Sequence, residues 1–344
     1  MSRLLTGLDL GSSNIRVAVC EIGINKKPNL LALESKPSTG ISQGIVAGLD
    51  AAKNEISTLL QKVEKKINRR IRSLTVSLGT PGIKGEMATG IVGLSKRPRQ
   101  ITKSDIEKCK RIAGLIDLPA EREVIHKELH SFYINENDRV ENPLGLFATK
   151  LITKIYIITA ESSTLMNLTN CIQHAGYLID GFIYAGKALL QTVLKEEDKS
   201  RDVLIIDIGS HLTNITLAEK GALKFMSNFA VGTMNLKDKP LINRFFETVK
   251  AKAEGVDYSK VMMTGGGALE EGVIESAEEN MNVPCEIGRV RAKWCFLGSK
   301  DALLHTISLG LIICKAKMLD TKKNENHPVR RATQFIANIF EDYF

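Results

Sequence analysis

The order of strands, turn and helix predicted at the start of the chain recurs in its second half. In residues 4–78, two strands flank a turn at 11–14, and a third strand, a helix and a fourth strand follow. Residues 203–264 repeat this order around a second turn at 209–213. Two copies of one pattern predict a duplicated α/β fold. The predicted strands are 4–10, 15–22, 30–36 and 74–78 with a helix at 49–67, then 203–208, 214–218, 222–228 and 260–264 with a helix near 240–253.

Both turns, and a third glycine-rich turn at 265–267, predict contacts with phosphate. Glycine and small hydroxyl residues leave several backbone N–H groups free to donate in one direction. An aspartate before such a turn suits hydrated Mg²⁺, which takes few protein carboxylates. The third turn precedes a helix predicted from Glu270 to about Met281, which suits a nucleoside and its inner phosphate. The candidate ligands are Asp9, Gly11, Ser12, Ser13, Asn14, Asp207, Gly209, Ser210, His211, Gly265, Gly266 and Gly267, with Asp9 and Asp207 holding Mg²⁺ through water.

Two of these predictions have plain structural alternatives. Asp9 and Asp207 would act only as caps of their turns in a fold that has lost its ligand. His211, inside the second turn, either donates to phosphate or caps the loop.

Residues 83–160 depart from the repeated pattern. Thr102 and Asp105 have the spacing of a capping box, and the helix that they open ends before Pro119. Strand-like runs follow at 123–125, 131–134 and 151–159. We interpret this block as an inserted small α+β subdomain.

The end of the chain combines a polar segment with an apolar stripe. Residues 320–328 have no apolar period and are predicted to form a linker. In 329–344, apolar residues recur at helical spacing, and Arg330 and Arg331 suit anionic headgroups. This helix is predicted to bind a membrane surface reversibly, the alternative being a groove of the protein itself or of a partner. Its membrane-facing residues are Phe335, Ile336, Ile339, Phe340, Tyr343 and Phe344.

Composition excludes several classes. The most apolar run, 307–314, is far shorter than the ~20 residues of a membrane span. The net charge of +8 is compatible with an anionic partner and does not identify it. The basic stretch 62–72 lacks interleaved aromatic residues, so we expect a solvated face and no nucleic acid. The six cysteines form no Cys-x-x-C pair, which fits a reducing cytosol. His126 and His130 would share a face of a helix, but the pattern lacks the base of a zinc protease.

At the three turns the chain resembles the FtsA family of actin-like bacterial cell-division proteins. Residues 7–13 resemble its first phosphate motif, 204–209 its second and 263–269 its adenosine motif. Residues 83–159 resemble the subdomain 1C that this family carries, and 158–176 are similar to the stretch after it. The likeness covers nearly the whole chain, and the 1C block and the C-terminal stripe are specific to this family within the actin superfamily.

The resemblance implies two actin-like, ribonuclease H-like domains around a nucleotide cleft, with the inserted 1C (SHS2-like) subdomain and a C-terminal amphipathic helix. It also implies a peripheral protein on the cytoplasmic face of the inner membrane, at the division site. There it would tether the tubulin-like protein FtsZ, form homo-oligomers or filaments through 1C and recruit later division proteins. ATP with Mg²⁺ would control assembly, with weak or absent hydrolysis and no catalytic residue that we can name. The implied domains are 1A (1–82 and 161–200), 1C (83–160), 2A (201–319) with a reduced 2B remnant (233–258), a linker (320–328) and the membrane helix (329–344).

The chain departs from the family's pattern at four places. Asn14 stands where the family usually has a lysine that reaches the outer phosphates. Ser210 and Leu212 replace a glycine and a threonine of the second motif. Ala185-Gly186 replaces a Glu-Pro pair, and the segment 233–258 is much shorter than the usual subdomain 2B. These departures weaken the predictions of nucleotide affinity and of FtsZ docking.

Two other functions remain open from the sequence. One is an actin-like adaptor of type IV pilus assembly, which would bind a short peptide from a membrane partner. The other is a small-molecule kinase on the same fold, although the short segment 233–258 argues against a closing lobe.

Overall fold

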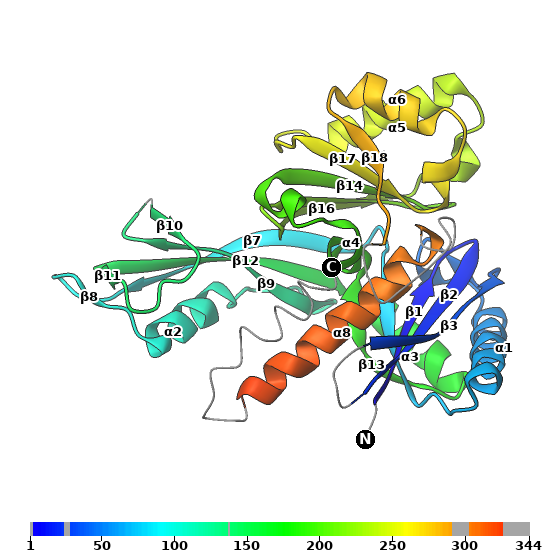
Figure 1. Ribbon diagram of the computed structural model, residues 1–344, viewed down its shortest axis with the longest axis horizontal. Coiled ribbons are helices and arrows are strands. Elements are labelled where there is room, and N and C mark those ends of the chain that lie inside the picture. The colour runs from blue at the N-terminus through cyan, green and yellow to red at the C-terminus, as the bar shows by residue number, and fades with distance from the viewer. Residues whose placement is uncertain (1–2, 24–27, 137, 291–302, 326–344) are drawn as a thin grey trace.

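Two similar sheets and one inserted domain surround a pair of central helices (Figure 1). The computed structural model describes residues 3–23, 28–136, 138–290 and 303–325. The first sheet has the order β13-β6-β1-β2-β3 and the second has the order β18-β17-β14-β15-β16. Their strands are β1 (Arg3–Leu10), β2 (Asn14–Ile22), β3 (Pro28–Pro37), β6 (Ser73–Leu78), β13 (Leu178–Tyr184), β14 (Asp202–Ile208), β15 (Thr213–Glu219), β16 (Ala222–Phe229), β17 (Lys260–Thr264) and β18 (Cys285–Ile287).

The two sheets have the same pairing senses. β1 pairs antiparallel with β2 and parallel with β6, and β14 pairs antiparallel with β15 and parallel with β17. β13 and β18 extend their sheets in parallel, whereas β3 and β16 extend them antiparallel. The duplicated α/β fold expected from the sequence is therefore confirmed.

Helices cover both sheets because their apolar residues share one side. α1 (Leu49–Ile67) buries Ile56, Leu59 and Leu60 against the first sheet and ends at Asn68 in the left-handed region. α3 (Ser162–His174) contributes to the same core. α5 (Lys239–Lys252) and α6 (Val273–Met281) cover one face of the second sheet. A short hairpin of β4 (Ile41–Ser42) and β5 (Ile45–Val46) precedes α1.

Two helices fill the space between the sheets. α4 (Ala185–Val193) buries Leu189 and Val193 in the core that also contains Val203 and Ile205 of the second sheet. α8 (Thr306–Glu325) crosses α4 and packs Leu309 and Ile312 against β1 and β2. In Figure 1 it runs diagonally across the molecule, in orange.

The segment 233–258 belongs to the second core. It consists of a 3-10 turn (Thr233–Asn235) and α5, whose Phe245 and Phe246 pack against the sheet and against each other. Its helix is thus the crossover between β16 and β17.

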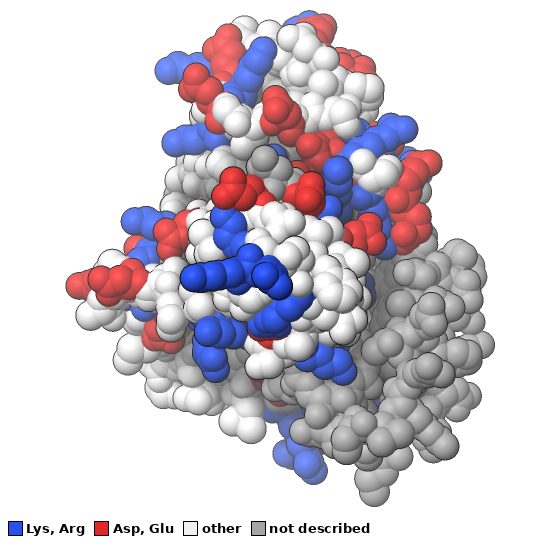
Figure 2. Space-filling view, turned by 90° about the vertical axis from the view of Figure 1, so that its left-hand side faces the viewer, with Lys and Arg blue, Asp and Glu red and all other residues white. Residues whose placement is uncertain are grey.

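The inserted domain projects away from the two sheets (Figure 1). It has the four-stranded order β10-β9-β12-β7, with α2 (Lys103–Ala113) packed on β7 and β12. Figure 2 looks onto the side from which it projects, where Lys and Arg side chains gather near the middle. The strands are β7 (Lys84–Gly93), β8 (Arg99–Gln100), β9 (Arg122–Ile134), β10 (Asp138–Val140), β11 (Phe147–Ala148) and β12 (Lys150–Glu161).

Several predictions about individual elements were wrong. His126 and His130 lie on the continuous strand β9, so the helix considered for them does not form. The helix expected from Glu270 begins only at Val273, after a 3-10 turn at Gly266–Leu269. Residues 320–325, predicted to be linker, continue α8, because adding residues to a helix that is already packed requires no new nucleation.

The C-terminal helix cannot be compared with the structure. The remaining linker residues 326–328 and the segment 329–344, with Phe335, Ile336, Ile339, Phe340, Tyr343 and Phe344, lie outside the described residues. Of the helices in the described ranges, none is both long and apolar enough to cross a bilayer.

Candidate functional site

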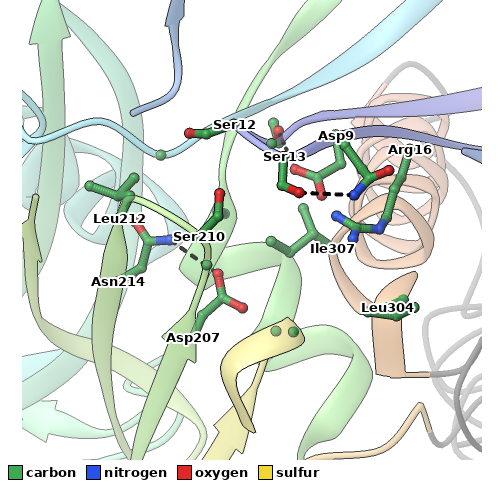
Figure 3. Close-up of a pocket in the computed structure, with 18 of the residues that line it drawn as sticks. Asp9, Ser12, Ser13, Arg16, Asp207, Ser210, Leu212, Asn214, Leu304 and Ile307 are labelled. Carbon is green, nitrogen blue, oxygen red and sulfur yellow. Dashed lines mark hydrogen bonds between the residues drawn. The ribbon is translucent and has the colours of Figure 1, made fainter. Parts of the chain in front are cut away.

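A cavity of about 360 Å³ lies where the three glycine-rich turns meet between the two sheets. Figure 3 shows the turn after β1 on one side, the turn after β14 on the other, and α8 behind Asp9 and Arg16. Ten of the twelve candidate ligands line it: Asp9, Gly11, Ser12, Ser13, Asn14, Asp207, Gly209, Ser210, Gly265 and Gly266. The volume is within the usual range of small-molecule sites.

Asp9 is a buried carboxylate at the carboxyl end of β1. Its Oδ1 accepts a hydrogen bond from the Ser77 hydroxyl at 2.8 Å, and that hydroxyl accepts the N–H of Leu10 at 3.1 Å. Burial raises the pKa of Asp9 to about 6, against the opposing charge of Arg16 and the Ser77 hydrogen bond. The nearby charge of Asp207 raises the pKa further. The two carboxylates therefore share one electrostatic environment.

Asp207 occupies the equivalent place on β14. Its Oδ1 accepts from the Thr264 hydroxyl at 3.0 Å and its Oδ2 accepts from Asn214 Nδ2 at 3.1 Å. Burial raises the pKa of Asp207, and these two hydrogen bonds oppose the rise.

The turns present unused backbone donors. The N–H groups of Ser12 and Ser13, and those of Ser210 and His211, donate to no group among the described residues. The Ser12 hydroxyl accepts from the N–H of Gln43 at 2.8 Å, which fixes the first turn. Free N–H groups in a turn of this kind suit an anion with several oxygens.

The glycine at the start of the third turn is required by its backbone. Gly265 has a φ of +82°, and a Cβ there would lie 2.4 Å from the carbonyl oxygen of Ile208. Gly266 faces open space, because a Cβ there meets nothing within 4 Å.

Two predicted ligands lie outside the lining of this cavity. His211 is exposed, and its Nδ1 lies 3.0 Å from the Ser210 hydroxyl. Gly267 is buried, and a Cβ there would lie 2.3 Å from Cγ2 of Ile208, which makes it a packing glycine.

Other lining residues were missed by the sequence analysis. Arg16 pairs with Asp9 across β1 and β2, and Asn214 pairs with Asp207 across β14 and β15. The predicted hairpins contained this signal, because strands joined by a tight turn place one of the first residues after the turn opposite the aspartate. Leu304 and Ile307, near the start of α8, are distant in sequence from every turn and carried no such signal.

The residues present fit a hydrated cation. Asp9 and Asp207 both line the cavity, and Oδ1 of Asn214 is a buried acceptor without a hydrogen-bond partner. Metal-bound water would satisfy such an oxygen. Within the described ranges, no group of three or more His, Cys, Asp or Glu side chains could hold a metal directly. Mg²⁺ would therefore depend on its own waters and on ligand oxygens.

Comparison with known families identifies the inserted domain. A family model described as the SHS2 domain inserted in FtsA matches residues 81–159. The chain is also 26% identical over 352 residues to the cell division protein FtsA of Borreliella burgdorferi, covering 84% of this chain and 85% of that protein. The resemblance to FtsA is confirmed. With other FtsA proteins the match is shorter, and it spans 53% of the Pseudomonas aeruginosa protein at 26% identity.

Solved structures show the same fold at low identity. The structure of a PilM-PilN type IV pilus biogenesis complex has a TM-score of 0.64 at 16% identity, covering 91% of this chain and 98% of that chain. MreB5 of Spiroplasma citri bound to ADP has a TM-score of 0.51 at 12% identity, covering 94% and 99%. The FtsA-like chain therefore has the actin-like architecture.

Proposed function

We propose that this FtsA-like chain is a nucleotide-binding scaffold of bacterial cell division. The observation that carries the proposal is the convergence of three turns, from two copies of one fold, on a single cavity. The name shared by its curated relatives supports the role in division. The ADP bound to MreB5 in its solved structure supports a nucleotide as ligand.

The proposed ligand is ATP with Mg²⁺. The N–H groups of the turns at 11–14 and 209–211 would hold the phosphates, and Gly265 and Gly266 would lie under the nucleoside. Asp9, Asp207 and Asn214 would hold the waters of Mg²⁺. The proposal includes weak or absent hydrolysis.

The proposed partners follow from the resemblance to FtsA. The segment 329–344 would bind anionic lipid at the cytoplasmic face of the inner membrane, and the chain would tether FtsZ there. The inserted domain would mediate self-association into oligomers or filaments, and later division proteins would join the assembly. No contact with nucleic acid is part of the proposal.

Calorimetric titration with ATP and Mg²⁺ tests the nucleotide part. We expect the full chain to bind, and we expect Gly266→Leu to weaken binding by at least tenfold, because its side chain would enter open space in the cavity. Gly93→Leu is the control, since a Cβ at Gly93, on the inserted domain, also meets nothing within 4 Å. Absence of binding to the full chain at millimolar ATP would refute a nucleotide ligand.

Co-sedimentation with vesicles tests the membrane part. The full chain should sediment with vesicles that contain anionic lipid, and a chain lacking residues 329–344 should remain in solution. Equal sedimentation of the two chains would refute the tether.

Peptide capture separates the division role from the pilus role. We expect immobilised chain to retain a C-terminal tail peptide of FtsZ and to release an N-terminal peptide of a pilus assembly protein. The reverse preference would favour the pilus adaptor.

A further inference from the structure

Arg16 places a positive charge inside the candidate nucleotide cavity. It lies on β2 directly opposite Asp9, and its side chain extends toward the cavity beside the Asp9 carboxylate (Figure 3). The first turn is close to its guanidinium, because a Cβ on Gly11 would lie 3.6 Å from an Nη of Arg16. Among the described lining residues, Arg16 is the only cation, whereas Asp9, Asp207 and Glu270 are acidic.

No residue in the described ranges accepts a hydrogen bond from this guanidinium. Arg16 makes no hydrogen bond and no ion pair with any described residue, although its charge acts on both Asp9 and Asp207. Arginine carries five N–H donors in a planar fork that matches the oxygens of a phosphate group. A half-buried arginine beside an anion-binding turn, with no donor used by a described residue, points to an anionic ligand.

Position 14 cannot supply this charge. Asn14 lies at the end of the first turn, and its amide Nδ2 donates to the Ser13 hydroxyl at 3.2 Å. Arg16 is two residues further along β2, so its side chain projects from the same face of the strand. A positive charge is therefore available from Arg16, the next residue on the same face of β2.

We propose that Arg16 contacts the outer phosphates of the bound nucleotide and makes the site selective for nucleoside di- and triphosphates. This inference rests on the proposed function of nucleotide binding. It assigns to Arg16 the charge that the resembled family supplies from the position of Asn14.

Titration with ATP, ADP and adenosine tests the proposal. We expect Arg16→Gln to weaken ATP and ADP by roughly 10- to 100-fold and adenosine by less than threefold, because only phosphate meets the guanidinium. Adding Asn14→Lys to Arg16→Gln should reverse at least a third of the change in the logarithm of the ATP dissociation constant. Thermal unfolding without ligand reports whether each variant is folded.

The other results of these titrations also decide whether Arg16 contacts phosphate. If the unaltered chain binds no nucleotide, the proposed function fails, and the inference fails with it. If it binds ATP and Arg16→Gln binds ATP equally well, or loses ATP and adenosine alike, Arg16 is only a counterion and the inference alone is wrong. Should Arg16→Gln not fold, Arg16→Lys takes its place: a three- to tenfold fall in the ATP-to-adenosine affinity ratio supports the proposal, and an unchanged ratio overturns it.

Discussion

Burial disfavours the ionised form of both aspartates at the cavity. Asp9 and Asp207 are both buried, and burial is the largest influence on the pKa of each. Each carboxylate is stabilised by neutral hydroxyl or amide donors. A bound cation would favour the ionised form of both side chains.

Asp9→Asn should stabilise the ligand-free protein at neutral pH. The pKa of Asp9 is about 6 in the folded chain against 3.8 ordinarily, so the folded state disfavours the ionised form. The cost is absent below about pH 4, appears as the pH rises and is complete above pH 6, where it reaches roughly 2–3 kcal/mol. Urea unfolding should show that gain for Asp9→Asn at pH 7.5 and almost none at pH 4.

Asp117→Asn provides the control for this measurement. Asp117 is exposed in a loop, so its replacement should change the free energy of unfolding by less than about 0.5 kcal/mol. A gain for Asp9→Asn that stays constant from pH 4 to 7.5 would contradict the assigned cause.

At the residue scale, the sequence predicted the glycine-rich turns better than it predicted the side chains that line the cavity between them. Asp9 and Asp207 were found because glycine-rich turns follow them, and Gly267 was included because it belongs to the same run. The structure uses Gly267 for packing against Ile208, a contact between segments far apart in the chain. Arg16 was missed because the predicted turn ended at Asn14, and Arg16 belongs to the strand that follows.

At the scale of elements, α4 and α8 cross at small residues. A Cβ on Gly310 of α8 would lie 2.2 Å from the carbonyl oxygen of Ala188 on α4. Neither atom belongs to a flexible side chain, so an added methyl group must separate the helices.

Gly310→Ala should therefore destabilise the protein. Alanine in place of glycine inside a helix ordinarily stabilises by up to about 1 kcal/mol, whereas overpacking costs about 1–3 kcal/mol. We expect a net loss of roughly 1–2 kcal/mol in chemical unfolding. Gly93→Ala, at an open position in β7, should be neutral or slightly stabilising, and a stabilising Gly310→Ala would disprove the close crossing.

α2 begins with the capping box that its sequence predicted. The Thr102 hydroxyl accepts the N–H of Asp105 at 3.3 Å, and Asp105 Oδ2 accepts the N–H of Thr102 at 2.9 Å. Arg99 holds the pKa of Asp105 well below its usual value, so this cap persists in mild acid.

Thr102→Ala should weaken the inserted domain by about 1 kcal/mol. Hydrogen exchange should show faster exchange in α2 than in the unaltered chain. Ser104→Ala is the matched control, because Ser104 is exposed in the same turn and no described residue bonds to its side chain. Equal effects of the two substitutions would mean that the cap contributes nothing.

Elements with local signals were predicted well, and those set by distant contacts were not. α1 and four strands of each sheet follow from periodicity in their own residues, whereas the outer strands β13 and β18 were not predicted. The sequence predicted two short strands in place of β9, because the run at 126–130 is polar. In the structure, pairing with β12 makes this segment one continuous strand. The extension of α8 through 320–325 likewise depends on packing earlier in the helix.

At the scale of the molecule, the inserted domain is attached to both sheets. His126 on β9 accepts the backbone N–H of Tyr184 at 3.1 Å, next to α4. Burial lowers the pKa of His126 to about 3, so the ring stays neutral and can accept. On the other side, Glu219 of β15 accepts from Arg139 at 2.8 Å and lies 3.1 Å from His130 Nε2.

Glu219→Ala should loosen the second of these attachments. It leaves the buried His130 and the half-exposed Arg139 without their acceptor, a loss of roughly 2 kcal/mol. Hydrogen exchange should rise in β9 and β10 while the first sheet keeps its protection. Glu136→Ala removes an exposed ion pair with Lys150 inside the inserted domain and should leave exchange unchanged.

The duplication of the two sheets was predictable only because the chain repeats itself. A single Asp-x-Gly turn would have indicated little, but two in the same context predicted the β1–β2 and β14–β15 hairpins. The contact of the inserted domain with Glu219 had no sequence signal, because Arg139 and Glu219 are about eighty residues apart and are joined by a single ion pair.

The two attachments tie the inserted domain to a different sheet each. The two sheets are also joined near the cavity by Tyr184, whose hydroxyl lies 3.0 Å from that of Thr216, and by Asn228, which donates to the carbonyl of Thr80. A rotation of one sheet relative to the other would strain one of these attachments while the other holds, so the position of the inserted domain depends on the relative position of the two sheets.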